Sequence, residues 1–321
     1  MVQVSDRADS NPPEARGDVA GIVAAELWDP RGRPASWQRW RRDLPALLHA
    51  VLAEWDLRPD GYRGVGECAI VLGVHTPDGE RAALKVGWPH PESAHEHIAL
   101  RLWAGDGAVR LLRADPARGA LLLERAGPED LTSVDPLAAC EIIARLYPRL
   151  HRPATAQLTR LSDLSARWSR ELAALPADAP VPHRLVSQAA ALAADFATDR
   201  ATDGRLLHSD LHYFNVLAAD REPWLVIDPK PLSGDPSFEV APLLWNRWDE
   251  VLATGTIREA VRARMTAATD AAGFDPQRAR DWVIVRELVN VMWTLHDAPT
   301  VGPSERQWIT RSVTIAKAVQ D

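Results

Sequence analysis

The sequence predicts an α+β protein in two lobes, a small antiparallel sheet with one helix followed by a mainly helical lobe. Three observations support this class. The chain has 321 residues, 46% of them apolar, which is enough to bury the cores of two modest domains. Most of the short β-like runs, separated by glycine-containing turns, fall between residues 61 and 124. Beyond Gly127 helical periodicity dominates the chain.

The boundaries follow from composition. Residues 1–18 are polar and proline-containing without an apolar segment, so we expect a loose, untargeted tail. Residues 19–125 are expected to form the first lobe. At Glu124–Pro128 strand patterns give way to helical ones, so residues 126–321 are expected to form the second lobe.

Charge and cysteine content argue against several classes of protein. The formal net charge of −7 disfavours a nucleic-acid-binding surface. Cys68 and Cys140 are too few for a zinc cluster or a disulfide framework, which favours a reducing cytoplasm. No apolar run reaches membrane-spanning length. We therefore expect a cytoplasmic monomer or dimer with neither a nucleic-acid nor a membrane partner.

In the first lobe, an apolar stripe over residues 19–57 predicts a largely helical segment that packs on a sheet. Runs at residues 70–74 and 81–86 flank an Asp-Gly turn, the pattern of a hairpin. Two further strands are expected at residues 109–113 and 120–124. The stripe contains Trp28, Trp37, Trp40, Leu44, Leu47, Leu48, Val51, Leu52 and Trp55.

Residues 61–69 read as a glycine-bearing turn before this hairpin. Glycine allows the backbone to approach a phosphate closely, so Gly64, Gly66 and Cys68 are candidates for covering a nucleotide. The plainer alternative is that these glycines only turn the chain. At the end of the lobe, backbone groups of Glu124 and Ala126 are placed to read an adenine edge.

Lys85 is the more informative residue of this lobe. An ammonium in the apolar run Ala83–Val86 is unfavourable to bury without an anion nearby. A helix predicted over residues 92–103 carries Glu96 on its apolar stripe, so we expect Glu96 to pair with Lys85, which would also contact nucleotide phosphates. Glu92 is the second choice of partner, and an ordinary surface ion pair is the alternative.

The second lobe is expected to be built from helices over residues 135–150, 161–175, 183–199, 257–272, 276–296 and 303–319, with Asp235 capping another helix. The C-terminal helices carry acidic and aromatic side chains that either wall an acceptor pocket or form a solvated face. These side chains are Asp281, Trp282, Glu287 and Asp297.

The main functional motif runs from His208 to Lys230. Two β-like runs, residues 205–208 and 224–227, flank a polar loop, and a hairpin would return Asp228 beside Asn215. Asp210 and Asn215 fit H-x-D-x-x-x-x-N, the spacing of a kinase catalytic loop. A carboxylate base, an amide oxygen and a second carboxylate for Mg²⁺ are what phosphoryl transfer requires.

Taken in order, these motifs resemble the aminoglycoside phosphotransferase family, and within it the streptomycin 6-kinase-like branch, also described as aminoglycoside/hydroxyurea antibiotic resistance kinases. The resemblance covers residues 55 to 293 and rests on the glycine segment, Lys85, Glu96, His208–Asn215 and Ile227–Pro231. It implies a bilobal protein-kinase-like fold. It also implies Asp210 as catalytic base, Asn215 and Asp228 as Mg²⁺ ligands, and Lys85 as a phosphate contact held by Glu96.

The chain departs from the family pattern at several positions. Ser209 replaces the usual glycine before the aspartate, Tyr213 and Phe214 are bulkier than usual, and Glu239 stands where an aspartate is usual. We expect Ser209, Tyr213 and Phe214 to line the acceptor side, which leaves the acceptor open.

The expected activity is transfer of the γ-phosphoryl group of ATP, with GTP as an alternative donor, to a hydroxyl of a small acceptor such as a streptomycin-like antibiotic, giving resistance. The alternatives are a kinase of another antibiotic, for example a nucleoside, a kinase of a metabolite alcohol or amino sugar, and a catalytically silent nucleotide-binding protein.

Overall fold

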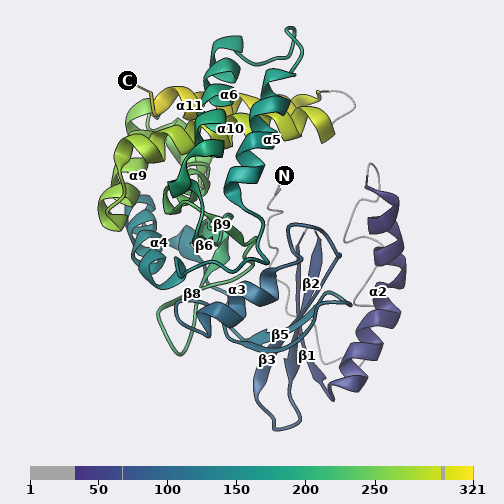
Figure 1. The fold of residues 1–321 in the computed structure, drawn as a ribbon. Coiled ribbons are helices and arrows are strands. Elements are labelled where there is room, and N and C mark those ends of the chain that lie inside the picture. Colours follow the sequence, from purple (N-terminus) through teal and green to yellow (C-terminus); the bar gives the residue numbers. More distant parts are fainter. Residues whose placement is uncertain (1–32, 67, 298–300, 321) are drawn as a thin grey trace. The chain divides into compact units, whose positions relative to one another are not determined.

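The computed structural model describes residues 33–66, 68–297 and 301–320, and the chain divides into two compact units (Figure 1). The first unit runs to Gly105 and includes Val109–Ala126, and the second contains Asp106–Ala108 and the chain from Gly127 onward. The first holds a five-stranded sheet and the second most of the helices. The α+β class is therefore confirmed.

The sheet of the first unit is antiparallel throughout, in the order β1-β2-β3-β5-β4. The predicted hairpin is present, with Gly79 at the turn in the left-handed region (φ 84°), where glycine has no steric penalty. Strands β3 and β5 are buried at consecutive residues, so side chains on both faces of the sheet are covered there. The strands are β1 (Arg58–Val65), β2 (Ala69–His75), β3 (Arg81–Gly87), β4 (Leu111–Asp115) and β5 (Ala120–Glu124).

Helix α2 (Ala35–Glu54) covers one face of this sheet through its apolar stripe. Trp37, Leu44 and Leu48 are fully buried and belong to the same hydrophobic cluster as Ile70 and Leu84 of the sheet. The part of the predicted helix that precedes residue 33, including Trp28, lies outside the described residues. The described part ends at Glu54, which leaves a short connection before β1.

Two predictions for this unit are wrong. Residues 61–65 belong to strand β1, because Gly64 pairs with Val71 of β2 and this pairing outweighs the turn preference of glycine. Helix α3 (Glu96–Trp103) begins four residues later than predicted. The preceding residues form turns in which the Ser93 hydroxyl donates to the carbonyl of His90, a local bond that competes with helix formation.

The second unit is mainly helical and contains two small two-stranded sheets, β6 with β9 and β7 with β8. Most of the predicted helix boundaries agree with the structure to within two residues. The helices are α4 (Pro136–Leu150), α5 (Leu161–Ala173), α6 (His183–Thr198), α7 (Ala241–Leu244), α8 (Trp248–Ala253), α9 (Ile257–Ala272), α10 (Pro276–Asp297) and α11 (Pro303–Ala318), and the strands are β6 (Arg205–Leu207), β7 (Val216–Ala218), β8 (Trp224–Val226) and β9 (Leu232–Gly234).

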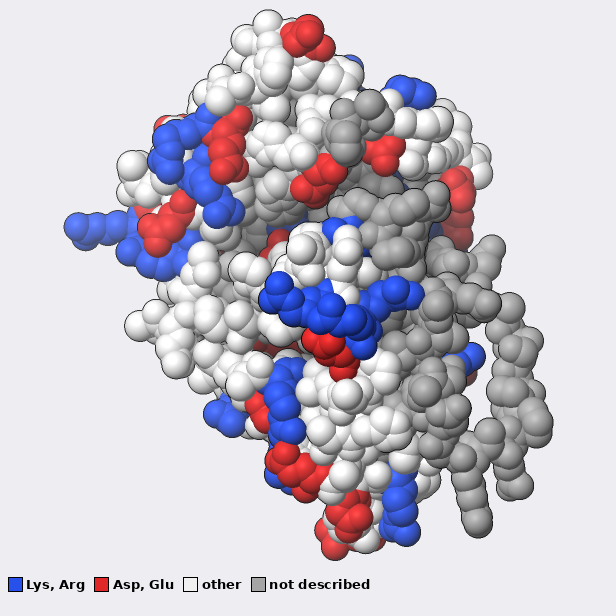
Figure 2. Space-filling model, turned by 90° about the vertical axis from the view of Figure 1, so that its right-hand side faces the viewer, with Lys and Arg blue, Asp and Glu red and all other residues white. Residues whose placement is uncertain are grey.

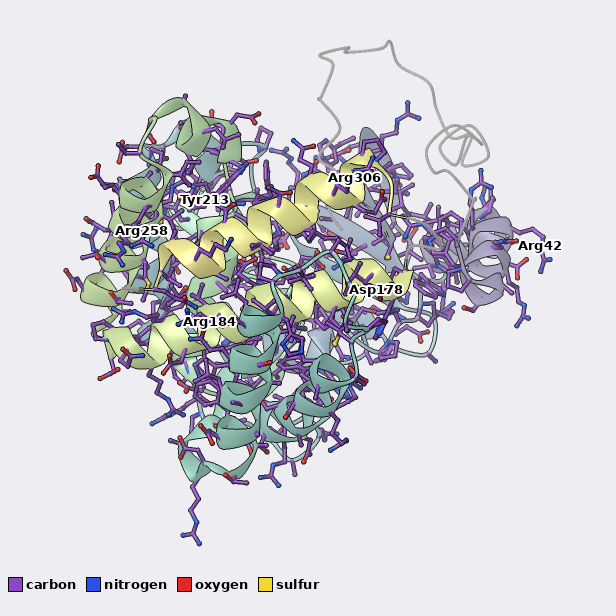
Figure 3. All side chains as sticks on the ribbon, turned by 90° about the horizontal axis from the view of Figure 1, so that it is seen from above. Arg42, Asp178, Arg184, Tyr213, Arg258 and Arg306 are labelled. Carbon is purple, nitrogen blue, oxygen red and sulfur yellow. The ribbon has the colours of Figure 1, made fainter. Side chains whose placement is uncertain are left out.

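Helix α10 is the central element of this unit. Its middle segment, Trp282–Met292, is buried apart from the half-buried Arg286, and the helix contacts α11, α6 and α5; Figure 3 shows α10 and α11 side by side. A helix segment that is buried on nearly every side is expected at the centre of a helical core. Its contacts with the 3-10 helix at Pro236–Val240 bring it to the segment that follows the main motif.

The described residues contain no helix long and apolar enough to cross a membrane. On the face of the molecule in Figure 2, basic and acidic side chains lie next to one another.

Candidate active site

The first unit contributes a buried ion pair. The Nζ atom of Lys85 on β3 lies 2.8 and 2.7 Å from the two carboxylate oxygens of Glu96 in α3. Both residues are more than nine-tenths buried, so each charge depends on the other for compensation. The predicted pairing is confirmed, and Glu92 is exposed. The contact of Lys85 with a nucleotide stays a prediction.

The glycine segment is tied to the sheet edge. The N–H of Gly66 donates to the carbonyl of Ala69 at 2.9 Å, and the carbonyl of Cys68 accepts from the N–H of Trp88 at 2.7 Å. Gly64 lies within β1. Gly66 and Cys68 lie between β1 and β2, and the contact of this segment with phosphate stays a prediction.

The segment expected to read an adenine edge is partly engaged as well. The N–H of Glu124 donates to the carbonyl of Arg110 at 2.9 Å, and the Glu124 side chain accepts the N–H of Arg110 at 2.9 Å. Because that N–H is already bonded to Arg110, the donor available to an adenine would be at Ala126.

In the second unit, a buried carboxylate positions the loop that follows β6. The Glu239 carboxylate accepts the N–H of His208 at 2.5 Å and the N–H of Ser209 at 3.1 and 3.2 Å. His151 Nε2 lies 3.7 Å from the same group. Burial alone would raise the pKa of Glu239, but His151, His208 and the Ser209 N–H outweigh it and hold that pKa below its usual range. Glu239 is thus an ionised anchor of the loop.

Asp210 lies at the centre of this loop and is 8% exposed. Its Oδ2 lies 2.5 Å from Lys230 Nζ and 3.9 Å from His212 Nε2. Burial would raise the pKa of Asp210, but Lys230, His212 and Arg286 hold it below the ordinary value. The carboxylate is therefore ionised at neutral pH, as a base that accepts a hydroxyl proton must be.

Asn215 and Asp228 are brought together by the hairpin of β7 and β8. The N–H of Ile227 donates to the carbonyl of Asn215 at 3.0 Å, which places Asp228 next to it. The Asn215 amide nitrogen donates to the carbonyl of Asp210 at 2.8 Å, so the amide oxygen is the atom that would bind a cation. One amide oxygen and one carboxylate suit Mg²⁺, which retains water and phosphate oxygens as its other ligands.

The described part of the chain has no group of three or more His, Cys, Asp or Glu side chains arranged to hold a metal ion. The Asn215 and Asp228 pair is a smaller donor set than such a group. It matches the way Mg²⁺ binds together with substrate phosphates, and not a cage made only of protein ligands.

Two backbone positions in the site have unusual conformations. Ser209 and Asp228 have φ values of 61° and 56°, in the left-handed region that disfavours residues with a Cβ atom. Such conformations are unfavourable by about 1–3 kcal/mol and persist only where surrounding contacts enforce them. Here the Ser209 hydroxyl donates to the carbonyl of Lys230, and the Lys230 N–H donates to the carbonyl of His208 at 3.0 Å.

The structure overturns the expectation that Ser209 and Tyr213 line the acceptor side. Both are buried, and the Ser209 hydroxyl is bonded to the carbonyl of Lys230. The Tyr213 hydroxyl, on the residue labelled in Figure 3, donates to the carbonyl of Pro136 at 2.8 Å and lies 3.2 Å from the sulfur of Cys140. Tyr213 holds the loop onto α4 and Ser209 ties it to the segment of Lys230, while Phe214 alone of the three is partly exposed.

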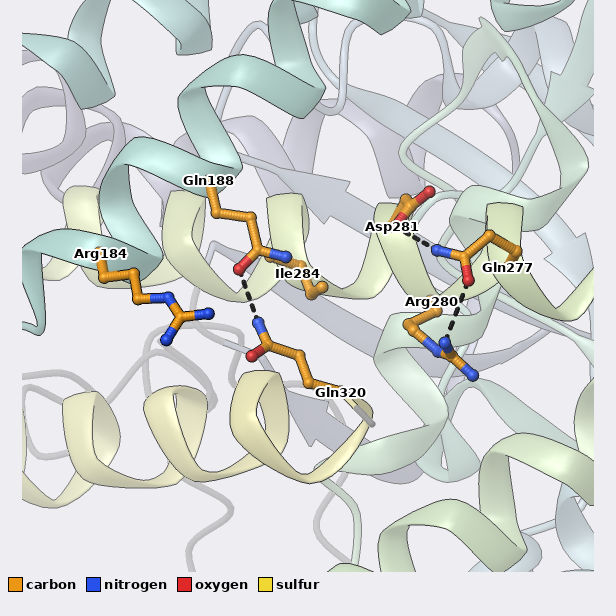
Figure 4. Close-up of a pocket in the computed structure, with 7 residues that line it drawn as sticks. All are labelled: Arg184, Gln188, Gln277, Arg280, Asp281, Ile284 and Gln320. Carbon is orange, nitrogen blue, oxygen red and sulfur yellow. Dashed lines mark hydrogen bonds between the residues drawn. The ribbon is translucent and has the colours of Figure 1, made fainter.

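The acidic and aromatic residues proposed for an acceptor wall lie in different environments. Trp282 and Glu287 are completely buried, so they belong to the core of α10, and Asp297 is exposed. Asp281 lines an open cavity of about 450 Å³ that does not include Asp210 (Figure 4). The cavity is lined by Arg184, Gln188, Gln277, Arg280, Asp281, Ile284 and Gln320. As a group, the four residues do not form a pocket wall.

Three functional candidates are missed by the sequence argument. Lys230 contacts Asp210, Glu239 anchors the loop, and Arg286 affects the Asp210 carboxylate. The guanidinium of Arg286 lies 5.2, 5.4 and 6.0 Å from the ring centroids of Phe238, Trp293 and Trp245. A cation within the Ile227–Pro231 motif was a usable signal for Lys230, whereas nothing near Arg286 in sequence points to the site.

A family model and several known proteins match most of this chain. A family model described as aminoglycoside/hydroxyurea antibiotic resistance kinase matches residues 54–298. Streptomycin 6-kinase from Streptomyces glaucescens is 39% identical over 290 residues, which covers 88% of this chain and 91% of the relative. Hydroxyurea phosphotransferase from Kitasatospora aureofaciens is 39% identical over 292 residues, covering 88% and 82% respectively.

Among solved structures, a choline/ethanolamine kinase family protein from Mesorhizobium loti matches with a TM-score of 0.56. The match covers 85% of this chain and 94% of that one, at 18% sequence identity. Likeness at this identity supports the fold alone, and it agrees with the expected protein-kinase-like architecture.

Proposed function

The chain belongs to the aminoglycoside/hydroxyurea antibiotic resistance kinase family, and we propose that it transfers the γ-phosphoryl group of ATP to a hydroxyl of a streptomycin-like aminoglycoside. The observation that carries the proposal is Asp210, a buried carboxylate held ionised beside Asn215 and Asp228. Phosphorylation adds about two negative charges and considerable bulk, which spoils the fit of an antibiotic to its target. Resistance is the expected consequence.

Each residue has a separate role in the proposed reaction. The acceptor hydroxyl donates a hydrogen bond to Asp210, its oxygen bonds to the γ-phosphorus, and the bond from that phosphorus to the β,γ-bridging oxygen breaks. The hydroxyl proton passes to Asp210, and ADP leaves with the bridging oxygen. Asn215 and Asp228 would hold Mg²⁺, which neutralises the phosphate charge when bound. Lys85, oriented by Glu96, would contact the α- and β-phosphates.

A smaller neutral acceptor is the second candidate. The hydroxyurea phosphotransferase relative matches this chain as well as the streptomycin 6-kinase relative does, at 39% identity over 88% of the chain. A small uncharged hydroxyl compound, as in the name of that relative, is therefore the alternative acceptor.

One experiment tests the proposal and ranks the acceptors. Purified protein is incubated with MgATP and separately with streptomycin, with a second aminoglycoside, with hydroxyurea and with a nucleoside antibiotic. Mass spectrometry of each reaction then shows which acceptor gains one phosphoryl group. We expect streptomycin to gain one and reactions without protein to gain none. No modified product from any acceptor, with the protein folded and nucleotide bound, would contradict the proposal.

A further inference from the structure

Lys230 is placed against the catalytic carboxylate by the fold. Its Nζ lies 2.5 Å from Asp210 Oδ2, and its side chain is 34% exposed where that of Asp210 is 11% exposed. The ammonium therefore lies on the more accessible side of the carboxylate. The pair compensates the charge of the buried Asp210 carboxylate, and its lysine end is the more exposed one.

The backbone around Lys230 is fixed at both ends of the residue. Its N–H donates to the carbonyl of His208 at 3.0 Å, and its carbonyl accepts the hydroxyl of Ser209. Pro229 and Pro231 flank it and restrict the backbone further. The main chain of Lys230 is thus bound to the catalytic loop, while its half-buried side chain ends at the Asp210 carboxylate.

The use of lysine in this chain is selective. Only three of its 37 basic residues are lysines, namely Lys85, Lys230 and Lys317. Two of these pair with the functional carboxylates Glu96 and Asp210, and Lys317 is exposed near the end of α11. An ammonium is a compact charge on a flexible stem, whereas a guanidinium binds carboxylates through a planar fork. Lysine is therefore better suited than arginine to supply a cation that moves from one anion to another.

We propose that Lys230 is a catalytic residue whose ammonium moves from Asp210 to the γ-phosphoryl group during transfer. This inference rests on the proposed function. When the acceptor oxygen bonds to the γ-phosphorus and its proton passes to Asp210, the carboxylate loses its charge and its hold on Lys230. The ammonium keeps its own proton and hydrogen-bonds to the oxygens of the transferred group, where negative charge is concentrated.

The three lysines make a direct test of position possible. An acyl phosphate of ATP, in which the acyl group is joined to the γ-phosphate, acylates amines close to that phosphate and releases ATP. Peptide mapping of the full-length protein after this treatment should find acylated Lys230 and Lys85, both suppressed by excess ATP, with Lys317 unaffected. Labelling of Lys85 without Lys230 would overturn the inference but leave the proposed function standing. Labelling of neither lysine would argue against the nucleotide site itself.

A kinetic test separates a chemical role from a structural one. Lys230→Met should lower kcat by about 100-fold while the KM for ATP changes less than about threefold. Lys230→Cys should be equally slow, and alkylation with 2-bromoethylamine, which restores an ammonium of nearly the original length, should recover most of the loss. Lys317→Met is the control that keeps full activity, and alkylated wild-type protein measures the effect of modifying the native Cys68 and Cys140, against which the recovery of alkylated Lys230→Cys is compared. If alkylated Lys230→Cys stays inactive, or if Lys230→Met retains full kcat, the inference is wrong.

Discussion

The carboxylate of Glu239 accepts the N–H of Ser209 with both of its oxygens, at 3.2 and 3.1 Å. Through this contact a completely buried residue of the 3-10 helix after β9 fixes the loop that carries Asp210. The same carboxylate accepts the N–H of His208. The position of Asp210, the proposed catalytic base, is therefore set by a buried group of another element.

Replacing Glu239 should disturb catalysis and stability together. In Glu239→Gln one of the two oxygens becomes an amide group that faces backbone N–H donors, so at least one buried donor loses its acceptor. We expect kcat to fall by about tenfold or more and the free energy of unfolding by about 2–4 kcal/mol. The kcat and the free energy of unfolding of Glu239→Asp should lie between those of Glu239→Gln and the wild type, because aspartate keeps the charge on a shorter side chain. Denaturant unfolding and turnover measure both effects.

The matched control for Glu239 is an exposed carboxylate. Glu141 of α4 forms a surface pair with Arg145 at 2.6 Å. Glu141→Gln should change the free energy of unfolding by less than about 0.5 kcal/mol and leave kcat unchanged. If Glu141→Gln and Glu239→Gln lost equal amounts of kcat and of unfolding free energy, Glu239 would have no special role in holding the loop.

Glu96 should affect nucleotide binding by way of Lys85. In Glu96→Gln the buried ammonium loses its counter-charge and its orientation, so the Kd for ATP should rise by about 10- to 100-fold. Glu54, whose carboxylate lies 2.7 Å from Arg118 in an exposed pair, provides a control in the same unit. Calorimetric titration should find nearly wild-type affinity for Glu54→Gln, and equal affinity in Glu96→Gln would remove Lys85 from the nucleotide site.

Asn215 and Asp228 should govern the requirement for Mg²⁺. Chelation of the metal should abolish phosphoryl transfer, and Asp228→Ala should remain inactive at every Mg²⁺ concentration. Asn215→Ala should need a higher Mg²⁺ concentration, because one weak ligand is lost, and Asn215→Asp should regain part of the activity. Asp220, an exposed residue in the turn between β7 and β8, is the control. A wild-type Mg²⁺ dependence in Asn215→Ala would exclude the amide as a ligand.

Glu287 should make stability depend on pH. Burial raises the pKa of this carboxyl from 4.5 to about 7, and Ser312, Arg311, Arg286 and Asn290 offset only part of the effect. Below pH 4.5 both the folded and unfolded states are protonated. As the pH rises toward about 7 the unfolded chain loses the proton first, so the free energy of unfolding falls, by about 3 kcal/mol in total.

Glu287→Gln removes this titration, so the free energy of unfolding of the variant should be nearly constant where that of the wild type falls. Denaturant unfolding at pH 5 and pH 8 measures the difference. Glu305→Gln, at a half-buried position of α11, should keep the wild-type pH dependence. An unchanged pH dependence in Glu287→Gln would mean that another group is responsible.

Local patterns predicted most of the elements. The hairpin of β2 and β3 and the helix cap at Asp235 follow from short-range chemistry, and the structure has both of them. The pairing of Lys85 with Glu96 followed from the free energy of burying a charge. Errors arose where tertiary contacts outweighed local preference, as in β1, where pairing with β2 overrode the glycine turn.

The acceptor side was the least predictable part. Ser209 and Tyr213 are polar residues in a functional loop, and only the folded chain shows that their hydroxyls bond to backbone carbonyls. Arg286 and Glu239 act on the loop from positions 76 and 29 residues beyond Asp210, and no local spacing rule connects them to it. Long-range packing, which single-sequence patterns do not encode, determines these contacts.

The central claim is that Asp210 receives the proton of an acceptor hydroxyl during phosphoryl transfer. The most direct test is single-turnover transfer from γ-labelled ATP to the acceptor that the mass-spectrometric panel selects, with wild-type protein and Asp210→Asn compared under saturating MgATP. We predict that the variant binds ATP with nearly wild-type affinity but transfers the label at least about 1,000-fold more slowly. Transfer by Asp210→Asn at a rate close to that of the wild type would contradict the account.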